Sequence, residues 1–214
     1  MKFQAFKSCV QKYPVITGSL LNSLEEDERV LRNQLSRWTK QGLLVQLKRG
    51  LYLLNRNDRS REPSRFFLAN QMLFPSYISL ESALAFYHII PEGVYQTTSV
   101  TSGKPAQFAT PEGTFVFRHV KQSLFFGFDS IRDERGFEVL MAEPEKALLD
   151  FFYLNLAQFS PNDGKVFTES YRFSAEENLK PQRLAEYAAR FASTKLQRVA
   201  ELFIKTHLSR KKRA

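Results

Sequence analysis

One stretch of the sequence, Asp27 to Leu54, constrains the fold more than any other. Its apolar residues Leu31, Leu35 and Trp38 recur at steps of four and three. That is the spacing of one face of an α-helix, which we expect to span Asp27 to Gln41. The sequence therefore predicts a helix that buries this face and leaves the opposite face in solvent.

Both ends of the predicted helix carry suitable capping residues. Asp27 is a candidate N-cap, and the carboxylates of Asp27 and Glu28 suit the positive end of the helix dipole. Gly42 follows the last periodic residue, at a place where a helix C-terminus favours glycine. We therefore expect the helix to begin at Asp27 and to end before Gly42.

A short β-hairpin is predicted directly after this helix. The expected strands are Leu43 to Leu47 and Leu51 to Leu54. Between them, Gly50 supplies the left-handed residue of a three-residue turn. The tip then projects the cations Lys48 and Arg49, as the wing of a winged helix does toward the phosphate backbone of DNA.

The helix face opposite the apolar residues is polar and basic, which is typical of a DNA-recognition helix. Asn and Gln can pair with adenine edges in the major groove, and Arg can pair with guanine or hold phosphates. The candidate DNA-binding residues are Arg29, Arg32, Asn33, Gln34, Arg37, Lys40, Lys48 and Arg49. We expect Asn33, Gln34 and Arg37 to read bases and the others to contact phosphates. The alternative is a solvated charged helix beside an ordinary hairpin.

Two shorter helices are predicted before the recognition helix. Met1 to Gln11 is amphipathic. Thr17 or Ser19 is placed to cap a second helix through Leu20 to Leu24. Three helices and a hairpin complete a winged helix-turn-helix domain over residues 1–54.

Residues 55–64 are polar, charged and interrupted by proline, and they show no hydrophobic period. We interpret them as a linker in which Arg56, Arg59 and Arg61 lie along the phosphate backbone of the nucleic acid. Because no apolar pattern here joins the two sides, each domain is expected to keep its own core and to fold alone.

A second domain of mixed helices and strands is predicted over residues 65–214. Its expected helices are Phe66 to Phe74, Ser79 to His88, Glu143 to Leu156, Gln182 to Phe191 and Thr194 to Leu208. Its expected strands are Tyr95 to Thr101, Gln107 to Ala109, Thr114 to His119 and Phe137 to Met141. Ser79 is a candidate N-cap, and Pro144 fits the first position of its helix. The predicted fold class is α+β: a winged helix-turn-helix domain followed by a mixed α/β domain with terminal helices.

The positive charge of the chain is concentrated in two segments. The net charge is +9, and residues 27–61 hold nine Lys and Arg against three Asp and Glu. Residues 205–214, which include the basic tail Arg210 to Arg213, hold five against none. Such segregation favours a polyanionic partner over a generally cationic fold.

The single cysteine, Cys9, excludes an internal disulfide framework and fits a reducing compartment. The sequence contains no run of about eighteen apolar residues and no signal-peptide core. We therefore expect a cytoplasmic protein without membrane contact.

Glu143, Glu145 and Asp150 are the best candidates for an acidic catalytic or metal-binding cluster. On a helix that starts at Pro144, Glu145 and Asp150 point about 140° apart, so they do not converge. Asp150 can instead reach back to Lys146, one turn earlier. The three histidines are far apart in sequence, and there is no zinc-binding spacing, P-loop, dinucleotide-binding or hydrolase motif. The sequence therefore predicts no catalytic residue, no metal site and no cofactor.

Several segments, taken in order, match the pattern of one protein family. They are RNQLSRWTKQGLLVQLKRGLYLL, PSYISLESALAFYHIIPE, VTSGKPAQFATPEGTFVFRHV, FFGF and AEPEKALLD. The most specific elements are SLESAL, residues 79–84, and EPEKALLD, residues 143–150. Together they resemble the AbiEi family, the antitoxins of type IV (abortive-infection) toxin–antitoxin operons in bacteria. The resemblance runs from about residue 12 to about residue 156 and is less distinct over residues 157–214.

The resemblance implies an N-terminal winged helix that binds repeated sites in its own promoter. It also implies a C-terminal domain that neutralises a nucleotidyltransferase-like toxin encoded alongside. The residues expected on the antitoxin surface are Ser79, Glu81, Glu145, Lys146 and Asp150. One alternative is a stand-alone transcriptional regulator whose second domain senses a ligand or mediates oligomerisation. Another is an RNA-binding protein that uses the basic segments.

Overall fold

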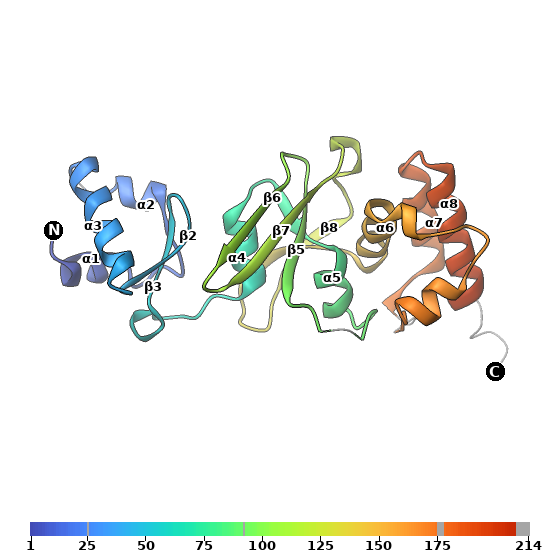
Figure 1. Cartoon of the computed structure of the whole chain (residues 1–214), viewed down its shortest axis with the longest axis horizontal. Helices are drawn as coiled ribbons and strands as arrows, with labels where there is room; N and C mark the ends of the chain where they lie inside the picture. Colours follow the sequence, from blue (N-terminus) through green and yellow to red (C-terminus); the bar gives the residue numbers. More distant parts are fainter. Residues whose placement is uncertain (25, 92, 175–177, 209–214) are drawn as a thin grey trace.

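The computed structural model describes residues 1–24, 26–91, 93–174 and 178–208, and within them the chain has an α+β fold. Figure 1 shows an elongated molecule, with the N-terminal helices at one end, a large sheet in the middle and the last helices at the other end. Within these ranges, helices long and apolar enough to cross a membrane are absent. The basic tail, Arg210 to Arg213, lies outside the described residues.

Residues 1–54 form three helices and a three-stranded antiparallel sheet of order β1-β3-β2. The elements are α1 (Phe3–Val10), β1 (Ile16–Thr17), α2 (Gly18–Asn22), α3 (Glu28–Lys40), β2 (Leu44–Lys48) and β3 (Leu51–Leu54). Phe6 of α1 packs on Trp38 of α3, with ring centroids 4.8 Å apart. Leu31 and Leu35 belong to the same core. The apolar face predicted for α3 is therefore buried.

The predicted boundaries of α3 are confirmed. The Asp27 carboxylate accepts a hydrogen bond of 2.9 Å from the Val30 amide, so Asp27 is the N-cap. At the other end, Gly42 has a φ of +72°. The Leu43 amide then donates to the Trp38 carbonyl at 2.9 Å. A left-handed residue followed by this bond is the capping pattern that favours glycine.

The hairpin after α3 is present, but its turn is tighter than predicted. Lys48 pairs with Leu51, so β2 extends to Lys48 and the turn consists of Arg49 and Gly50. Gly50 has a φ of +77°, as expected for the left-handed residue of the turn. The pairing register shifts just before Lys48, which places Leu47 in a bulge that the sequence pattern does not indicate.

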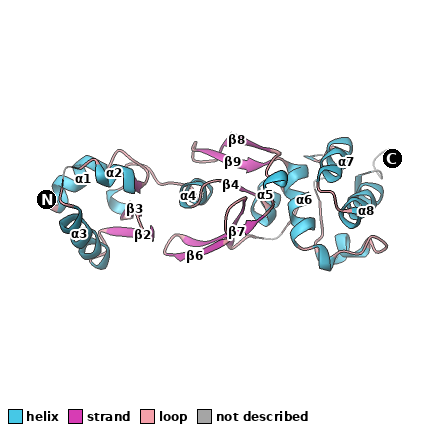
Figure 2. Cartoon of the chain, turned by 90° about the horizontal axis from the view of Figure 1, so that it is seen from above, coloured by secondary structure: helices cyan, strands magenta, loops and turns pink. Residues whose placement is uncertain are grey.

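The middle of the molecule is a six-stranded mixed sheet of order β6-β7-β5-β4-β9-β8. Its strands are β4 (Ser76–Ile78), β5 (Gln96–Thr101), β6 (Ala106–Thr110), β7 (Gly113–His119), β8 (Phe128–Arg132) and β9 (Glu138–Ala142). Figure 2 shows α4 (Arg65–Met72) on the side of the sheet that faces the N-terminal elements. On the other side lie α5 (Leu80–Phe86) and α6 (Pro144–Leu154). The four predicted strands are confirmed, whereas β4 and β8 were not predicted.

Two C-terminal helices, α7 (Pro181–Arg190) and α8 (Thr194–Phe203), pack against α6. Helix α8 continues into a π-helical turn, η6 (Ile204–Leu208). Many of the phenylalanines gather in this part of the molecule. The Phe152 ring contacts Phe159, Phe167 and Phe203 at centroid distances of 4.8, 5.6 and 5.6 Å. Such aromatic packing supplies a large share of the core here.

Residues 55–64 do not behave as a free linker, and a phosphate-following role is wrong for Arg59. The Arg59 side chain is only 4% exposed and forms ion pairs with Glu62 at 2.9 Å and Glu112 at 2.7 Å. Its Nε also donates to the Leu54 carbonyl at 2.7 Å. Arg59 therefore ties the end of β3 to the turn between β6 and β7.

Apolar contacts also join the two parts of the molecule. Leu47, Leu51 and Leu53, on one face of the N-terminal sheet, belong to the same buried cluster as the large sheet. The other face of the N-terminal sheet packs on α1 and α3. Arg61 adds a further contact, because its guanidinium lies 3.8 Å from the centroid of the Phe137 ring. The N-terminal part therefore has a buried cluster of its own, and one face of its sheet also joins the core of the large sheet. That each part folds alone stays a prediction.

Candidate functional site

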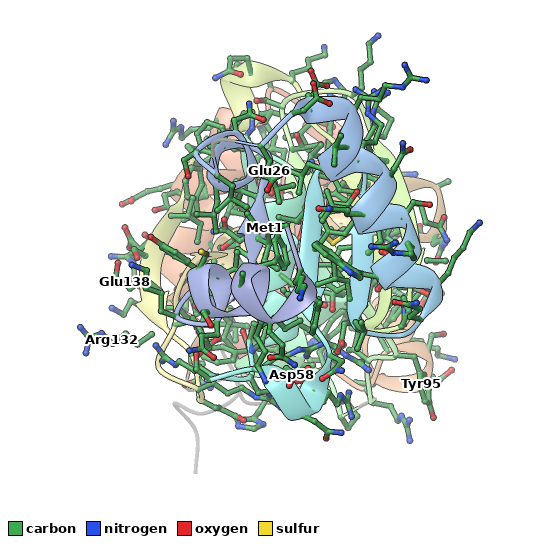
Figure 3. The ribbon with its side chains drawn as sticks, turned by 90° about the vertical axis from the view of Figure 1, so that its left-hand side faces the viewer. Met1, Glu26, Asp58, Tyr95, Arg132 and Glu138 are labelled. Carbon is green, nitrogen blue, oxygen red and sulfur yellow. The ribbon has the colours of Figure 1, made fainter. Side chains whose placement is uncertain are left out.

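Helix α3 exposes a basic stripe at the N-terminal end of the molecule. Its exposed residues are Arg29, Arg32, Asn33, Arg37 and Lys40. Arg29, Asn33, Arg37 and Lys40 recur at steps of three or four, and Arg32 is three residues from Arg29, which keeps all five on one side of the helix. In Figure 3, which views the molecule from this end, α3 lies at the right in light blue, at the edge of the molecule. Arg32 pairs with Glu28, but these side chains are 64% and 83% exposed, so the pair is weak in water.

Gln34 does not belong to this stripe, contrary to the prediction. Its Nε2 donates a hydrogen bond of 3.0 Å to the Met1 carbonyl. Its Oε1 is buried and has no hydrogen-bond partner among the described residues. The amide lies on the flank of α3, between the buried and the exposed faces. Gln34 is therefore placed to hold the Met1 backbone against α3 and not to reach a base.

The hairpin tip carries the other two predicted phosphate contacts. Arg49 is exposed, but Lys48 is half-buried. Thr17 of β1 pairs with the first residue of β3, directly beside the tip. A methyl group added to Gly18 would lie 3.9 Å from the Gly50 carbonyl oxygen. The tip therefore projects little beyond the rest of this sheet. Of its two cations, Arg49 is the more accessible to a phosphate group.

Most of the residues predicted to form an antitoxin surface are not on the surface. Ser79, Lys146 and Asp150 are fully buried, and Glu145 is 2% exposed. Glu81 is half-buried on α5. The prediction of a surface built from these residues is therefore wrong. The physical reason is that Ser79 and Lys146 both bond to Asp150 inside the protein, and Glu145 bonds to the Lys180 amide.

Lys146 and Asp150 form a buried ion pair one helical turn apart, as their spacing predicted. The Tyr77 hydroxyl lies between them. It accepts from Lys146 Nζ at 2.8 Å and donates to Asp150 Oδ2 at 2.9 Å. The Ser79 hydroxyl donates to the same carboxylate oxygen at 2.9 Å. Ser79 occupies the N-cap position of α5 as predicted, but its side chain serves Asp150 and thereby pins α6 to α5.

Burial shifts the protonation equilibria of this group. The pKa of Asp150 is raised because burial disfavours the carboxylate, and the Lys146 ammonium opposes this rise. The pKa of Lys146 is lowered, again because burial disfavours the charged form. Burial and Asp150 raise the pKa of Tyr77 well above its ordinary value, so the phenol keeps its proton. Aromatic rings enclose the ammonium, since Lys146 Nζ lies 5.1 Å from the ring centroids of both Phe126 and Phe191.

The carboxylates at the start of α6 fasten it to α7. Glu145 accepts a hydrogen bond of 2.7 Å from the Lys180 amide, directly before α7. Glu143 accepts from the Arg183 guanidinium and the Tyr187 hydroxyl, each at 2.9 Å. These carboxylates do not converge on a common centre. In the part of the chain that the structure describes, no group of three or more His, Cys, Asp or Glu side chains is arranged to hold a metal ion.

No pattern in the sequence marks Tyr77, which completes the buried group. Strand β4 is only three residues long and buried throughout, so it shows no alternation that would mark it. The half-buried rings of Phe125 and Phe128 pack on Tyr77 at centroid distances of 5.1 and 4.5 Å. These phenylalanine rings therefore belong to the packing of the core.

Comparison of the chain with known protein families found no match, and comparison with curated protein sequences found none either. A proposal for the function can therefore use two observations. They are the exposed basic stripe of α3 and the resemblance of several segments to the AbiEi family.

Proposed function

We propose that this protein is a DNA-binding antitoxin that represses its own toxin–antitoxin operon through an N-terminal winged helix. The main support for DNA binding is the exposed basic stripe of α3, together with Arg49 at the hairpin tip. The element order α1-β1-α2-α3-β2-β3 and the sheet order β1-β3-β2 support a winged helix. In such a domain the recognition helix enters the major groove of double-stranded DNA and neighbouring elements contact the backbone.

Neutralisation of a nucleotidyltransferase-like toxin is proposed from the resemblance to the AbiEi family. The buried Lys146–Asp150 pair holds α6 in place and presents no surface to a toxin. The proposal places the protein in the cytoplasm and requires no catalytic residue, metal or cofactor. Co-expression of the full chain with the toxin encoded beside it tests the antitoxin part. A folded chain that fails to rescue cells from that toxin would overturn it.

A stand-alone transcriptional regulator whose second part senses a ligand is the second candidate. A cavity of about 590 Å³, lined by residues between Ser64 and Arg135, favours this second candidate. The gene neighbourhood separates the two candidates, because the antitoxin requires an adjacent toxin gene and the regulator does not.

Replacing Asn33 or Arg37 by Ala is expected to weaken binding to the cognate promoter site by about 1–3 kcal/mol for each base that the side chain reads. Binding to a scrambled duplex should change much less, because base contacts supply the discrimination. Arg198→Ala removes an exposed arginine from α8 and is the charge-matched control for Arg37→Ala. Titration of both duplexes at one salt concentration measures the difference. Equal losses of affinity on the two duplexes would contradict base reading.

Arg49→Ala is expected to flatten the log–log dependence of affinity on salt concentration by about 0.9, which corresponds to one phosphate contact. Lys48→Ala should have the smaller effect, because the Lys48 side chain is half-buried. Binding isotherms at several salt concentrations measure both slopes. An unchanged slope for Arg49→Ala would mean that the hairpin tip faces away from DNA.

A further inference from the structure

The cavity of about 590 Å³ is lined by the start of α4, by α5, by the start of β5 and by the β8–β9 turn. Clefts of this size are typical of small-molecule sites. Neither the α3 stripe nor the Lys146–Asp150 pair contributes to its walls.

One wall of the cavity is apolar. Phe66 of α4 and Phe86 of α5 meet edge-to-face, with ring centroids 6.1 Å apart. Ala85 and Val94 also line the cavity. All four residues are only partly buried, so this wall presents apolar area that a ligand would remove from water.

The cavity also holds a cation that has no charged partner. Arg65 is the first residue of α4, and its exposed side chain makes no ion pair or hydrogen bond with any described residue. Arg135 differs, because its guanidinium donates to the Pro63 carbonyl at 3.3 Å. The N-terminus of α4 adds the positive end of a helix dipole on the side of Arg65. This side of the cavity suits a carboxylate.

The β8–β9 turn supplies the opposite charge. Asp133 is 8% exposed, and its Oδ1 accepts hydrogen bonds from the Arg135 and Phe137 amides at 3.0 and 2.8 Å. Its Oδ2 is buried without a hydrogen-bond partner among the described residues. Because this oxygen is closed to solvent, Asp133 holds the turn and does not reach a ligand. The exposed carboxylate of Glu134 lines the cavity, so this side suits an ammonium group.

We propose that this cavity binds a small zwitterion with an apolar side chain, of which a free aromatic amino acid is the simplest form. Its carboxylate would face Arg65, its ammonium group would face Glu134, and its side chain would lie on Phe66 and Phe86. A nucleotide fits less well, because its phosphates would add negative charge beside two carboxylates. The site lies apart from the DNA-binding stripe, so its failure would leave the proposed function unaffected.

Calorimetric titration of the full chain with L-phenylalanine tests the proposal. We expect saturable binding that weakens at least about tenfold for phenethylamine, which lacks the carboxylate, and for N-acetylphenylalanine, which lacks the ammonium group. Absence of saturable binding, equal binding of the three compounds, or preferential binding of AMP would each overturn it.

Two variants test the two ends of the site. Arg65→Met should weaken binding of L-phenylalanine at least about tenfold and leave phenethylamine unaffected. Glu134→Gln keeps the size of the exposed side chain and should weaken binding of L-phenylalanine while leaving binding of N-acetylphenylalanine unaffected. Arg132→Ala removes an exposed arginine outside the cavity and should bind as the original chain does. A thermal melt checks the fold of each variant. Unchanged binding of L-phenylalanine by either Arg65→Met or Glu134→Gln overturns the proposal.

Discussion

Replacing Asp150 by Ala is expected to lower the free energy of unfolding of the full chain by about 3–5 kcal/mol. The change leaves the buried Lys146 ammonium without its counter-charge and the Tyr77 and Ser79 hydroxyls without their acceptor. Most of the cost comes from the unpaired buried charge and not from the missing attraction. Urea unfolding followed by circular dichroism measures it. Asp129→Ala, at an exposed aspartate of β8, is the matched control and should stay within about 0.5 kcal/mol.

Removing both charges separates the effect of charge from that of shape. Lys146→Met combined with Asp150→Leu is expected to recover most of the stability that Asp150→Ala removes, because an apolar pair of similar size often replaces a buried ion pair without loss. The rings of Phe126 and Phe191 already surround the Lys146 side chain and offer a methionine apolar contacts. If the double variant unfolds as easily as Asp150→Ala, the explanation by an unpaired charge is wrong.

The same variants bear on the proposed antitoxin function. Because Lys146 and Asp150 are buried, loss of toxin rescue by Asp150→Ala should follow the loss of folded protein. A double variant that is stable but cannot rescue would assign this pair a role beyond holding α6 in place.

Helix α3 could be predicted from the sequence because its signals are local. Leu31, Leu35 and Trp38 repeat within two turns, and the caps at Asp27 and Gly42 adjoin the helix. The Lys146–Asp150 pair was predictable for the same reason, since four residues along a helix bring two side chains together.

The features that were missed depend on residues far apart in the sequence. Asp150 meets Ser79 and Tyr77 across separations of 71 and 73 residues, so their burial leaves no local pattern. A charged side chain such as Arg59 indicates solvent or phosphate when it is read alone, and its partner Glu112 lies 53 residues away. The prediction that Gln34 reads a base failed for a local reason. Gln34 lies on the flank of α3, and the spacing of the apolar residues does not separate this flank from the exposed face.

Replacing Arg59 by Ala is expected to lower the free energy of unfolding by about 3 kcal/mol. Glu112, whose side chain is 10% exposed, would lose its nearest cation, and the Leu54 carbonyl would lose its donor. Glu62 contributes less, because its side chain is 35% exposed and solvent screens the pair. Hydrogen exchange should also become faster in residues 55–64 and in the β6–β7 turn, which Arg59 connects.

Arg56 provides the matched control, because it reaches the same two carboxylates from solvent. Its side chain is 74% exposed, and its nitrogens lie 3.8 Å from Glu62 and 3.6 Å from Glu112. Pairs of this kind contribute about 0–1 kcal/mol, so Arg56→Ala should unfold almost as the original chain does. Equal destabilisation by the two substitutions would mean that the burial of Arg59 contributes nothing.

DNA binding gives an independent check on Arg59. A residue that contacts a phosphate changes the log–log salt slope by about 0.9 when it is removed. Arg59 is buried in ion pairs, so Arg59→Ala should leave this slope unchanged under conditions in which the variant is folded. A flattened slope would restore the role that the sequence alone predicted for Arg59, because the guanidinium would then have to leave Glu112 and reach the DNA backbone.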